Sequence, residues 1–289
     1  MKPAAFEYVV AESTASAVAA LAQARGEAKI IAGGQSLVPM LNFRLLRPAI
    51  LIDINRIPNL AYVREEPDAV RIGALTRHHQ LETSPVIARH LPVLTEAMAH
   101  VAHLAIRNRG TIGGSLSHAD PAAELPMMAM LLDAQLRIVS ATATRTVAAR
   151  DFFQDALSVD LADDELVTEV TLPKLSSRTG WGFAEVSRRS GDFALAAVAV
   201  TLTLAGDTIG QARIGVTGVA PTPRRVAAAE VLLAGGRVDD ATTQRVIAAV
   251  RAAAEPQTDL HASSDYRRHL IGVLAGRALA DAWKRAQAA

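Results

Sequence analysis

Short hydrophobic runs between polar turns fill the first part of the chain and predict strands. Three of these runs have the length and apolar character of buried strands: FEYVV, KIIA and AILIDI. Between the first two, Ser13 is placed to cap a helix that continues to about Arg25 and stops at Gly26. After KIIA, the segment Ser36–Arg44 predicts a short helix, which Pro48 ends.

The middle of the chain mixes alternating and helical patterns. LAYVR and AVRIGAL flank the polar turn EEPD and predict a hairpin. Three segments have the apolar spacing of helices: Thr76–Leu81, Pro92–Val101 and Ala122–Leu132. QLRIVS and RTVAA predict a second hairpin, and ELVTEVTLP predicts one more strand.

The pattern changes after a polar segment, KLSSRTG (174–180), which predicts a domain boundary. Beyond it, FALAAVAVTLTLAG and ARIGVTGVA predict two long adjacent strands. Three alanine-rich helices are expected next, near Arg224–Leu233, Asp240–Ala253 and Asp265–Arg285. In the last helix one face at helical spacing carries Tyr266, Leu270, Val273 and Leu274.

Composition narrows the classes of function. A chain of 289 residues, half of them hydrophobic, suggests two domains or one domain with an added lobe. A net charge of +1 with scattered arginines does not fit a nucleic-acid surface. The absence of cysteine excludes disulfides, thiolate zinc sites, cysteine nucleophiles and iron–sulfur ligation. No signal-peptide core and no apolar window of about 18 residues is found, so we expect a cytoplasmic protein without a transmembrane helix.

Two Gly-Gly pairs stand in similar surroundings, each followed by a serine and then a helical pattern: IAGGQS and TIGGSL. Glycine allows positive φ and close approach of another group to the backbone, and successive N–H groups in such a turn form an anion-binding nest. A following helix adds its positive end. The two turns together would suit the two phosphates of a dinucleotide. The alternative is that each pair is an ordinary strand-to-helix turn.

Other candidate chemistry is less specific. Neither G-x-G-x-x-G after a strand nor G-x-x-x-x-G-K-[ST] is present. Glu96, His100 and His103 lie one helical turn apart and would share a metal, but a solvated or core face is favoured. Asp120 and Glu124 would form an acid/base pair, or a helix cap with a first-turn carboxylate, or one of them would bind a ribose hydroxyl.

Four stretches in one order carry a resemblance to a known family. They are AGGQS followed by PMLNFRLLRPAILIDINRIPNL, then IRNRGTIGGSLSHADPAAELP, RRSGDFALAAVAV and SSDYRRHL. Together they resemble the FAD-carrying medium subunit of molybdenum hydroxylases of the carbon monoxide dehydrogenase and xanthine dehydrogenase type. The resemblance implies an α+β fold with a two-part FAD-binding domain of the PCMH type, unrelated to the Rossmann fold. That domain would span residues 1–176, with subdomains of about 1–55 and 56–176. A smaller C-terminal domain of the CO dehydrogenase flavoprotein type would span residues 177–289.

The same resemblance assigns cofactor-binding positions. The two double-glycine turns would hold the FAD pyrophosphate: Ala32, Gly33, Gly34, Gln35 and Ser36, with Thr111, Ile112, Gly113, Gly114 and Ser115. Asp120 and Glu124 would lie close to the flavin nucleotide, and Leu166 and Val167 on a strand beside it. Phe193 would lie near the isoalloxazine ring; the alternative is a core residue that begins a long strand.

Some positions depart from the pattern of the family. Some relatives carry a lysine near Phe183–Glu185 that contacts the cofactor, and this chain has none there. Some relatives have histidine in place of Gln35 or asparagine in place of Ser115. Glutamine and serine are still polar, so we expect tuning of the site and not its loss.

The function implied is electron transfer. The chain would bind one FAD noncovalently and accept electrons from two [2Fe–2S] clusters on a small subunit. Substrate would be oxidised at a molybdenum cofactor on a large subunit, in a dimer of heterotrimers, and electrons would leave the flavin for an external acceptor. No residue of this chain need be catalytic toward the organic substrate, and no metal ligand is expected. Two alternatives are a stand-alone flavin reductase of the same FAD fold and a scaffold subunit that has lost its flavin.

Overall fold

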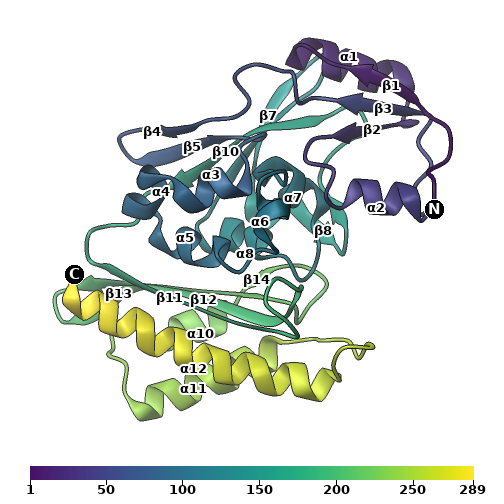
Figure 1. Cartoon of the computed structure of the whole chain (residues 1–289). Helices are drawn as coiled ribbons and strands as arrows, with labels where there is room; N and C mark the ends of the chain where they lie inside the picture. Colours follow the sequence, from purple (N-terminus) through teal and green to yellow (C-terminus); the bar gives the residue numbers. More distant parts are fainter.

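Three parallel strands form the first sheet of the computed structural model, which describes residues 1–289 (Figure 1). The strand order is β1-β3-β2, and the strands span Glu7–Val10, Ile50–Asp53 and Ala28–Ile31. Helix α1 (Thr14–Ala24) packs against this sheet, and α2 (Leu37–Asn42) follows β2. Ser13 caps α1 by accepting a hydrogen bond from the N–H of Ser16, and Arg25 ends the helix in a left-handed conformation.

The middle of the chain builds an antiparallel sheet of five strands in the order β4-β5-β10-β6-β7. These strands span Val63–Glu65, Ala69–Gly73, Leu166–Pro173, Gln135–Val139 and Thr144–Ala148. Six helices cover one of its faces: α3 (His78–Thr83), α4 (Pro85–His90), α5 (Pro92–Met98), α6 (Leu104–Arg107), α7 (Ile112–His118) and α8 (Glu124–Leu131). The short elements α9 (Ala149–Phe152), β8 (Phe153–Asp155) and β9 (Ser158–Val159) connect β7 to β10.

A second antiparallel sheet, in the order β11-β12-β13-β14, is buried on both faces. Its strands span Thr179–Ser187, Ala194–Ala205, Thr208–Thr217 and Arg224–Arg225. Ala197 and Ala199 of β12 belong to the core shared with the middle helices, whereas Val198 and Val200 face the C-terminal helices. Those helices are α10 (Ala227–Val231), α11 (Asp240–Ala253) and α12 (Ser264–Ala288). Burial on both faces explains the nearly unbroken hydrophobic run of β12.

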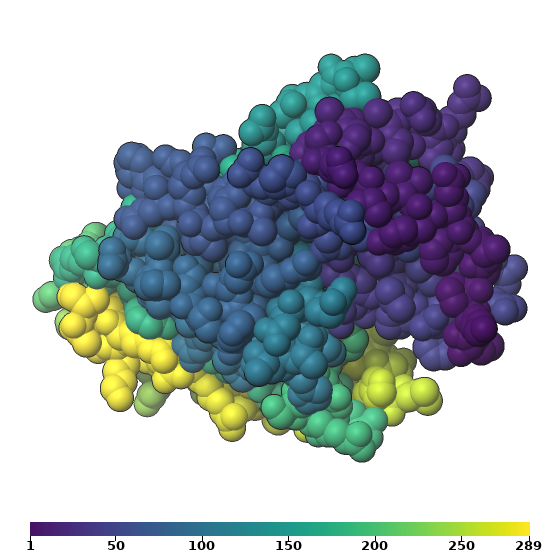
Figure 2. All heavy atoms as spheres, turned by 45° about the horizontal axis from the view of Figure 1, so that its top comes forward, coloured from purple at the N-terminus to yellow at the C-terminus, as the bar shows by residue number.

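The C-terminal lobe is fastened to the middle of the molecule by close packing and by one polar cluster. Gly180 and Gly182 let β11 touch the backbone of α12, because a Cβ at Gly182 would lie 2.0 Å from the carbonyl oxygen of Ala278. Glu96 on α5 accepts hydrogen bonds from Trp181 Nε1 at 3.1 Å and from Arg285 at 2.8 Å. Figure 2 shows the N-terminal lobe in purple and the C-terminal helix in yellow at opposite sides of the blue middle part.

Several elements differ from the sequence-based expectation. The strand β11 was not expected, and it begins inside the polar segment 174–180. The helix expected at Arg224–Leu233 is shorter, because Arg224 and Arg225 pair with β13 and the helix covers only Ala227–Val231. Tyr266 is 49% exposed, so it does not share the buried stripe of Leu270 and Leu274. No helix of the structure is both long and apolar enough to span a membrane.

Candidate functional site

The first Gly-Gly turn presents free backbone donors. Gly34 has φ of +70°, and the N–H groups of residues 33–36 donate to no acceptor of the chain. Gln35 folds back so that its amide donates to the carbonyl of Gly33 at 2.8 Å. The turn leads directly into α2, whose positive end lies beside these donors. This arrangement is an open nest for an anion.

The second Gly-Gly pair differs from the first, because it forms the opening turn of a helix. Thr111 is the N-cap of α7 and accepts a hydrogen bond from the N–H of Gly114 at 3.1 Å. The N–H groups of Ile112, Gly113 and Ser115 also have acceptors within the chain. A Cβ at Gly113 would lie 2.6 Å from that of Ala74, so this glycine serves close packing, whereas Gly114 is exposed. The two pairs, similar in sequence, are therefore different in structure.

Contacts between the two turns place them side by side. A Cβ at Gly33 would lie 2.2 Å from the carbonyl oxygen of Arg109, directly before the second turn. Arg77 links both segments by donating to that same carbonyl at 2.7 Å and to the Asn55 side chain at 2.7 Å. Asn55 in turn donates to the carbonyl of Ala32 at 2.8 Å. These bracing residues were missed from the sequence, because they come from loops that meet only in the folded chain.

His78 fills the space behind the second turn. Its ring is buried, lies against Gly110 and is 3.1 Å from the carbonyl oxygen of Thr111. Burial lowers the pKa of His78 to about 4, so the imidazole is neutral at physiological pH. A neutral ring adds no charge behind the turn and serves to hold the backbone of Thr111.

Asp120 and Glu124 take different roles. Asp120 accepts a hydrogen bond from the N–H of Ala122 at 2.9 Å and is not the N-cap of α8, which is Ala123. Glu124 begins α8 but is 7% exposed, and burial raises its pKa to about 7. Glu185, where some relatives have lysine close by, lies on the face of β11 that is turned toward α8. Burial and the charge of Glu124 raise the pKa of Glu185 to about 8.

The other residues that the sequence singled out lie near the boundaries between the lobes. Leu166 and Val167 begin β10 and are buried, Leu166 in the core of the N-terminal lobe and Val167 in the middle core. Phe193 is 64% exposed, so it is not the core residue that the alternative interpretation required. Glu96, His100 and His103 form no metal-binding group. His100 instead contacts the ring of Phe183, and His103 lies against Gly191.

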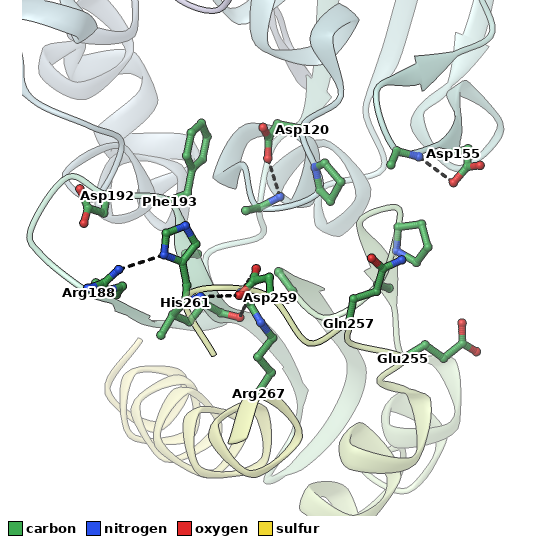
Figure 3. A pocket seen from close by; sticks show the side chains of 18 of the residues that line it. Asp120, Asp155, Arg188, Asp192, Phe193, Glu255, Gln257, Asp259, His261 and Arg267 are labelled. Atoms are coloured by element: carbon green, nitrogen blue, oxygen red, sulfur yellow. Dashed lines mark hydrogen bonds and ion pairs between the residues drawn. The ribbon is translucent and has the colours of Figure 1, made fainter. Parts of the chain in front are cut away.

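A cavity of about 860 Å³ opens between the FAD-binding part and the C-terminal lobe (Figure 3). Asp120, Pro121 and Ala122 line it on one side, together with Asp155 at the end of β8. The other side comes from the loop before β12, which includes Phe193, and from the segment before α12. The cavity therefore adjoins two of the positions expected near the flavin, Asp120 and Phe193, but contains no residue of either glycine turn.

Two family models together match most of the chain. The FAD binding domain in molybdopterin dehydrogenase matches residues 4–175, and the CO dehydrogenase flavoprotein C-terminal domain matches residues 181–282. The chain belongs to the family of FAD-carrying medium subunits of molybdenum hydroxylases. As such, it carries FAD and transfers electrons, and it works as a subunit of an oxidoreductase complex in which partner subunits hold the iron–sulfur clusters and the molybdenum cofactor. The predicted family, fold class and cofactor are thereby confirmed.

Individual relatives of this family resemble the chain over its whole length. The 6-hydroxypseudooxynicotine dehydrogenase complex subunit alpha of Paenarthrobacter nicotinovorans is 44% identical, over 99% of this chain and 97% of its own. The carbon monoxide dehydrogenase medium chain of Hydrogenophaga pseudoflava is 38% identical over 99% of both chains. In the solved structure of that CO dehydrogenase, which lacks the Mo-pyranopterin moiety, the matching chain superposes with a TM-score of 0.96 at 39% identity and 99% coverage of both chains.

Proposed function

We propose that the two glycine turns hold the FAD pyrophosphate between them. The observation that carries this proposal is the open nest of N–H groups at residues 33–36, fixed by the contact of Gly33 with Arg109. Side chains at these turns would occupy the space that the diphosphate needs. The proposed contact residues are Ala32, Gly33, Gly34, Gln35 and Ser36 on the first turn, and Thr111, Ile112, Gly113, Gly114 and Ser115 on the second.

The first turn would supply main-chain N–H donors to the pyrophosphate, and the second turn would supply a side-chain hydroxyl and exposed glycine backbone. The N–H groups of residues 112–115 already have acceptors, so Ser115 would contribute its hydroxyl and Gly114 its exposed backbone. The N-terminus of α7 adds the positive end of a helix. FAD supplies reversible redox chemistry when bound; this chain orients it and sets the dipoles around it.

The flavin ring would lie toward the seam between the two domains. Asp120 and Glu124 would lie beside the nucleotide, Leu166 and Val167 would form the strand next to it, and Phe193 would lie close to the ring. Support comes from the position of Asp120 and Phe193 on one cavity and from the place of Leu166 between the N-terminal and middle lobes. Within this proposal, residues 1–176 are the FAD-binding domain, with subdomains of about 1–55 and 56–176, and residues 177–289 are the C-terminal domain.

The complex would contain an iron–sulfur small subunit and a molybdenum large subunit, in the cytoplasm, as a dimer of heterotrimers. Electrons would reach the flavin from two [2Fe–2S] clusters and leave for an external acceptor. The absence of cysteine supports this division of labour, because this chain has no thiolates with which to hold a cluster. The substrate is set by the molybdenum subunit and not by this chain.

The test is purification of the tagged chain from its native host together with its untagged partners. The complex should show flavin and iron–sulfur absorbance, and substrate should bleach the flavin. The isolated chain should carry FAD, release it on acid precipitation and oxidise no aldehyde, purine or other heterocycle. A chain that purifies alone and reduces a substrate with NADPH would instead support the stand-alone flavin reductase. A chain without flavin absorbance would support the scaffold subunit.

A further inference from the structure

The cavity between the two domains has a lining that shares no residue with the two glycine turns. Its volume of about 860 Å³ lies within the range of pockets that hold small organic ligands. On its lining, Phe193 is the position that the proposed function places close to the ring, and Asp120 is one that it places beside the nucleotide. Within the proposed function, a second small molecule in this cavity would therefore lie close to the flavin ring.

Among the charged side chains of the lining that form no ion pair, the carboxylates outnumber the cations. Asp120, Asp155 and Asp192 form no ion pair, whereas Arg188 is the only cation of the lining without a carboxylate partner. The other charged groups of the lining are already paired within the chain. Asp259 pairs with Arg267 at 2.7 Å, and Glu255 pairs at 2.8 Å with Arg224, which lies outside the lining.

No part of the lining is suited to a phosphate. It contains no lysine, and the buried guanidinium of Arg267 donates to the carbonyl of Leu195 at 2.7 Å as well as to Asp259. Arg188 is engaged with the ring of His261 at 3.0 Å. A dinucleotide that brought its pyrophosphate here would meet three carboxylates that form no ion pair and only one such cation, Arg188.

The uncharged part of the lining is mostly small and apolar, with Gln257 and His261 as its polar side chains, and it suits a flat, uncharged molecule. Pro121, Ala122, Ala156 and Ala220 contribute small apolar surfaces, and Phe193 offers an exposed aromatic ring. Stacking on such a ring favours another planar system. Figure 3 shows Asp155 and Glu255 at the same side of the opening, with Phe193 and Asp192 across from them.

We propose that this cavity is the binding site of the external electron acceptor, and that it selects an uncharged acceptor of the quinone class over an anionic dinucleotide. The inference rests on the proposed position of the flavin ring. In the overall exchange, reduced FAD gives two electrons and two protons to the quinone, which leaves oxidised FAD and a hydroquinone. The carboxylates of Asp155 and Asp192 act as the charge filter, and Phe193 is the stacking surface.

The test compares a neutral and an anionic probe, 1,4-naphthoquinone and its 2-sulfonate, and isolates the effect of charge by changing the carboxylates of the cavity. Binding to the oxidised, FAD-loaded chain is measured by calorimetry, and reoxidation of the reduced chain by stopped-flow absorbance without oxygen. The sulfonate should bind about tenfold more weakly, because its negative charge is repelled by the unpaired carboxylates of the cavity. The double change Asp155→Asn and Asp192→Asn should narrow that ratio to about two- to threefold, and NAD⁺ should not compete with the quinone.

Asp207→Asn is the matched control, since Asp207 is an exposed carboxylate beyond the end of β12 that lies farthest from the cavity. It should keep the full tenfold ratio. Equal binding of both probes, or tighter binding of NAD⁺ than of the quinone, overturns the acceptor assignment while the flavin remains bound. A chain whose absorbance shows no FAD overturns the proposed function and this inference with it.

Discussion

Gly34 combines a backbone conformation that favours glycine with a position in the proposed FAD site. Its φ of +70° is costly for any side chain, and a Cβ there would lie 3.1 Å from Val38. Gly235 has a similar φ of +74° but nothing within 4 Å of the added atom. We expect Gly34→Ala and Gly235→Ala each to lower stability by about 1–2 kcal/mol, and only Gly34→Ala to lose FAD. Flavin absorbance of the purified variants decides; full occupancy in Gly34→Ala would remove the first turn from the site.

The buried carboxyls Glu124 and Glu185 give the chain a pH dependence. Their pKa values, raised by burial to about 7 and about 8, exceed the ordinary value of a glutamate, about 4.3. Their contribution to stability is therefore complete below about pH 4 and is lost as the pH rises through 7 to 8. His78 acts in the opposite sense below its ordinary pKa, because burial has lowered its pKa to about 4.

We expect Glu185→Gln to be more stable than the native chain at pH 8.5 by on the order of 1–3 kcal/mol. At pH 5 this advantage should disappear. Comparison of the two proteins at each pH cancels the effect of His78. Denaturant midpoints provide the measurement, with the exposed Glu12→Gln as control. A constant difference between the variants at both pH values would show that Glu185 is not the titrating group.

At the scale of elements, the sequence was sufficient to predict a helix where a single apolar face or a capping residue determines its bounds. The helix Asp240–Ala253 was expected with its observed bounds, because Asp239 caps it and its apolar spacing is regular. The segment at Arg224 was misassigned, since alanine-rich composition favours a helix while pairing with β13 holds Arg224 and Arg225 extended. Likewise, only the fold shows that the second glycine pair belongs to a helix.

Close packing of β11 on α12 could not be predicted from the sequence, because the two elements are far apart along the chain. A Cβ at Gly182 would lie 2.0 Å from the carbonyl oxygen of Ala278, and backbone on both sides cannot move aside cheaply. We expect Gly182→Ala to lower the free energy of unfolding by about 1–3 kcal/mol or more. Gly236→Ala, whose Cβ would meet its nearest atom at 3.5 Å, should change it little. Similar melting temperatures for the two variants would contradict this packing.

At the scale of the whole molecule, the proposed FAD site lies at the boundaries between the lobes. The family and the glycine turns were evident from short motifs, because these residues are close in sequence. Three features join segments that are far apart in the chain: the hydrogen bond between Asn55 and Arg77, the proximity of Glu124 and Glu185, and the cavity at Phe193. No local sequence pattern predicts them. The core around α8 likewise includes Phe183 of the C-terminal lobe, which ties the stability of one lobe to the other.

A ligand at these boundaries should stabilise all lobes together. Free FAD at 100 times its dissociation constant adds about 2.7 kcal/mol to the stability of a chain that binds it only when folded. Both tryptophans, Trp181 and Trp283, lie in the C-terminal lobe, so their fluorescence reports its unfolding. We expect the tryptophan midpoint temperature to rise with FAD concentration, in step with the release of the flavin, and Gly34→Ala to abolish the rise. A tryptophan transition that stays at one temperature while flavin release shifts would mean that the C-terminal lobe unfolds independently of the cofactor.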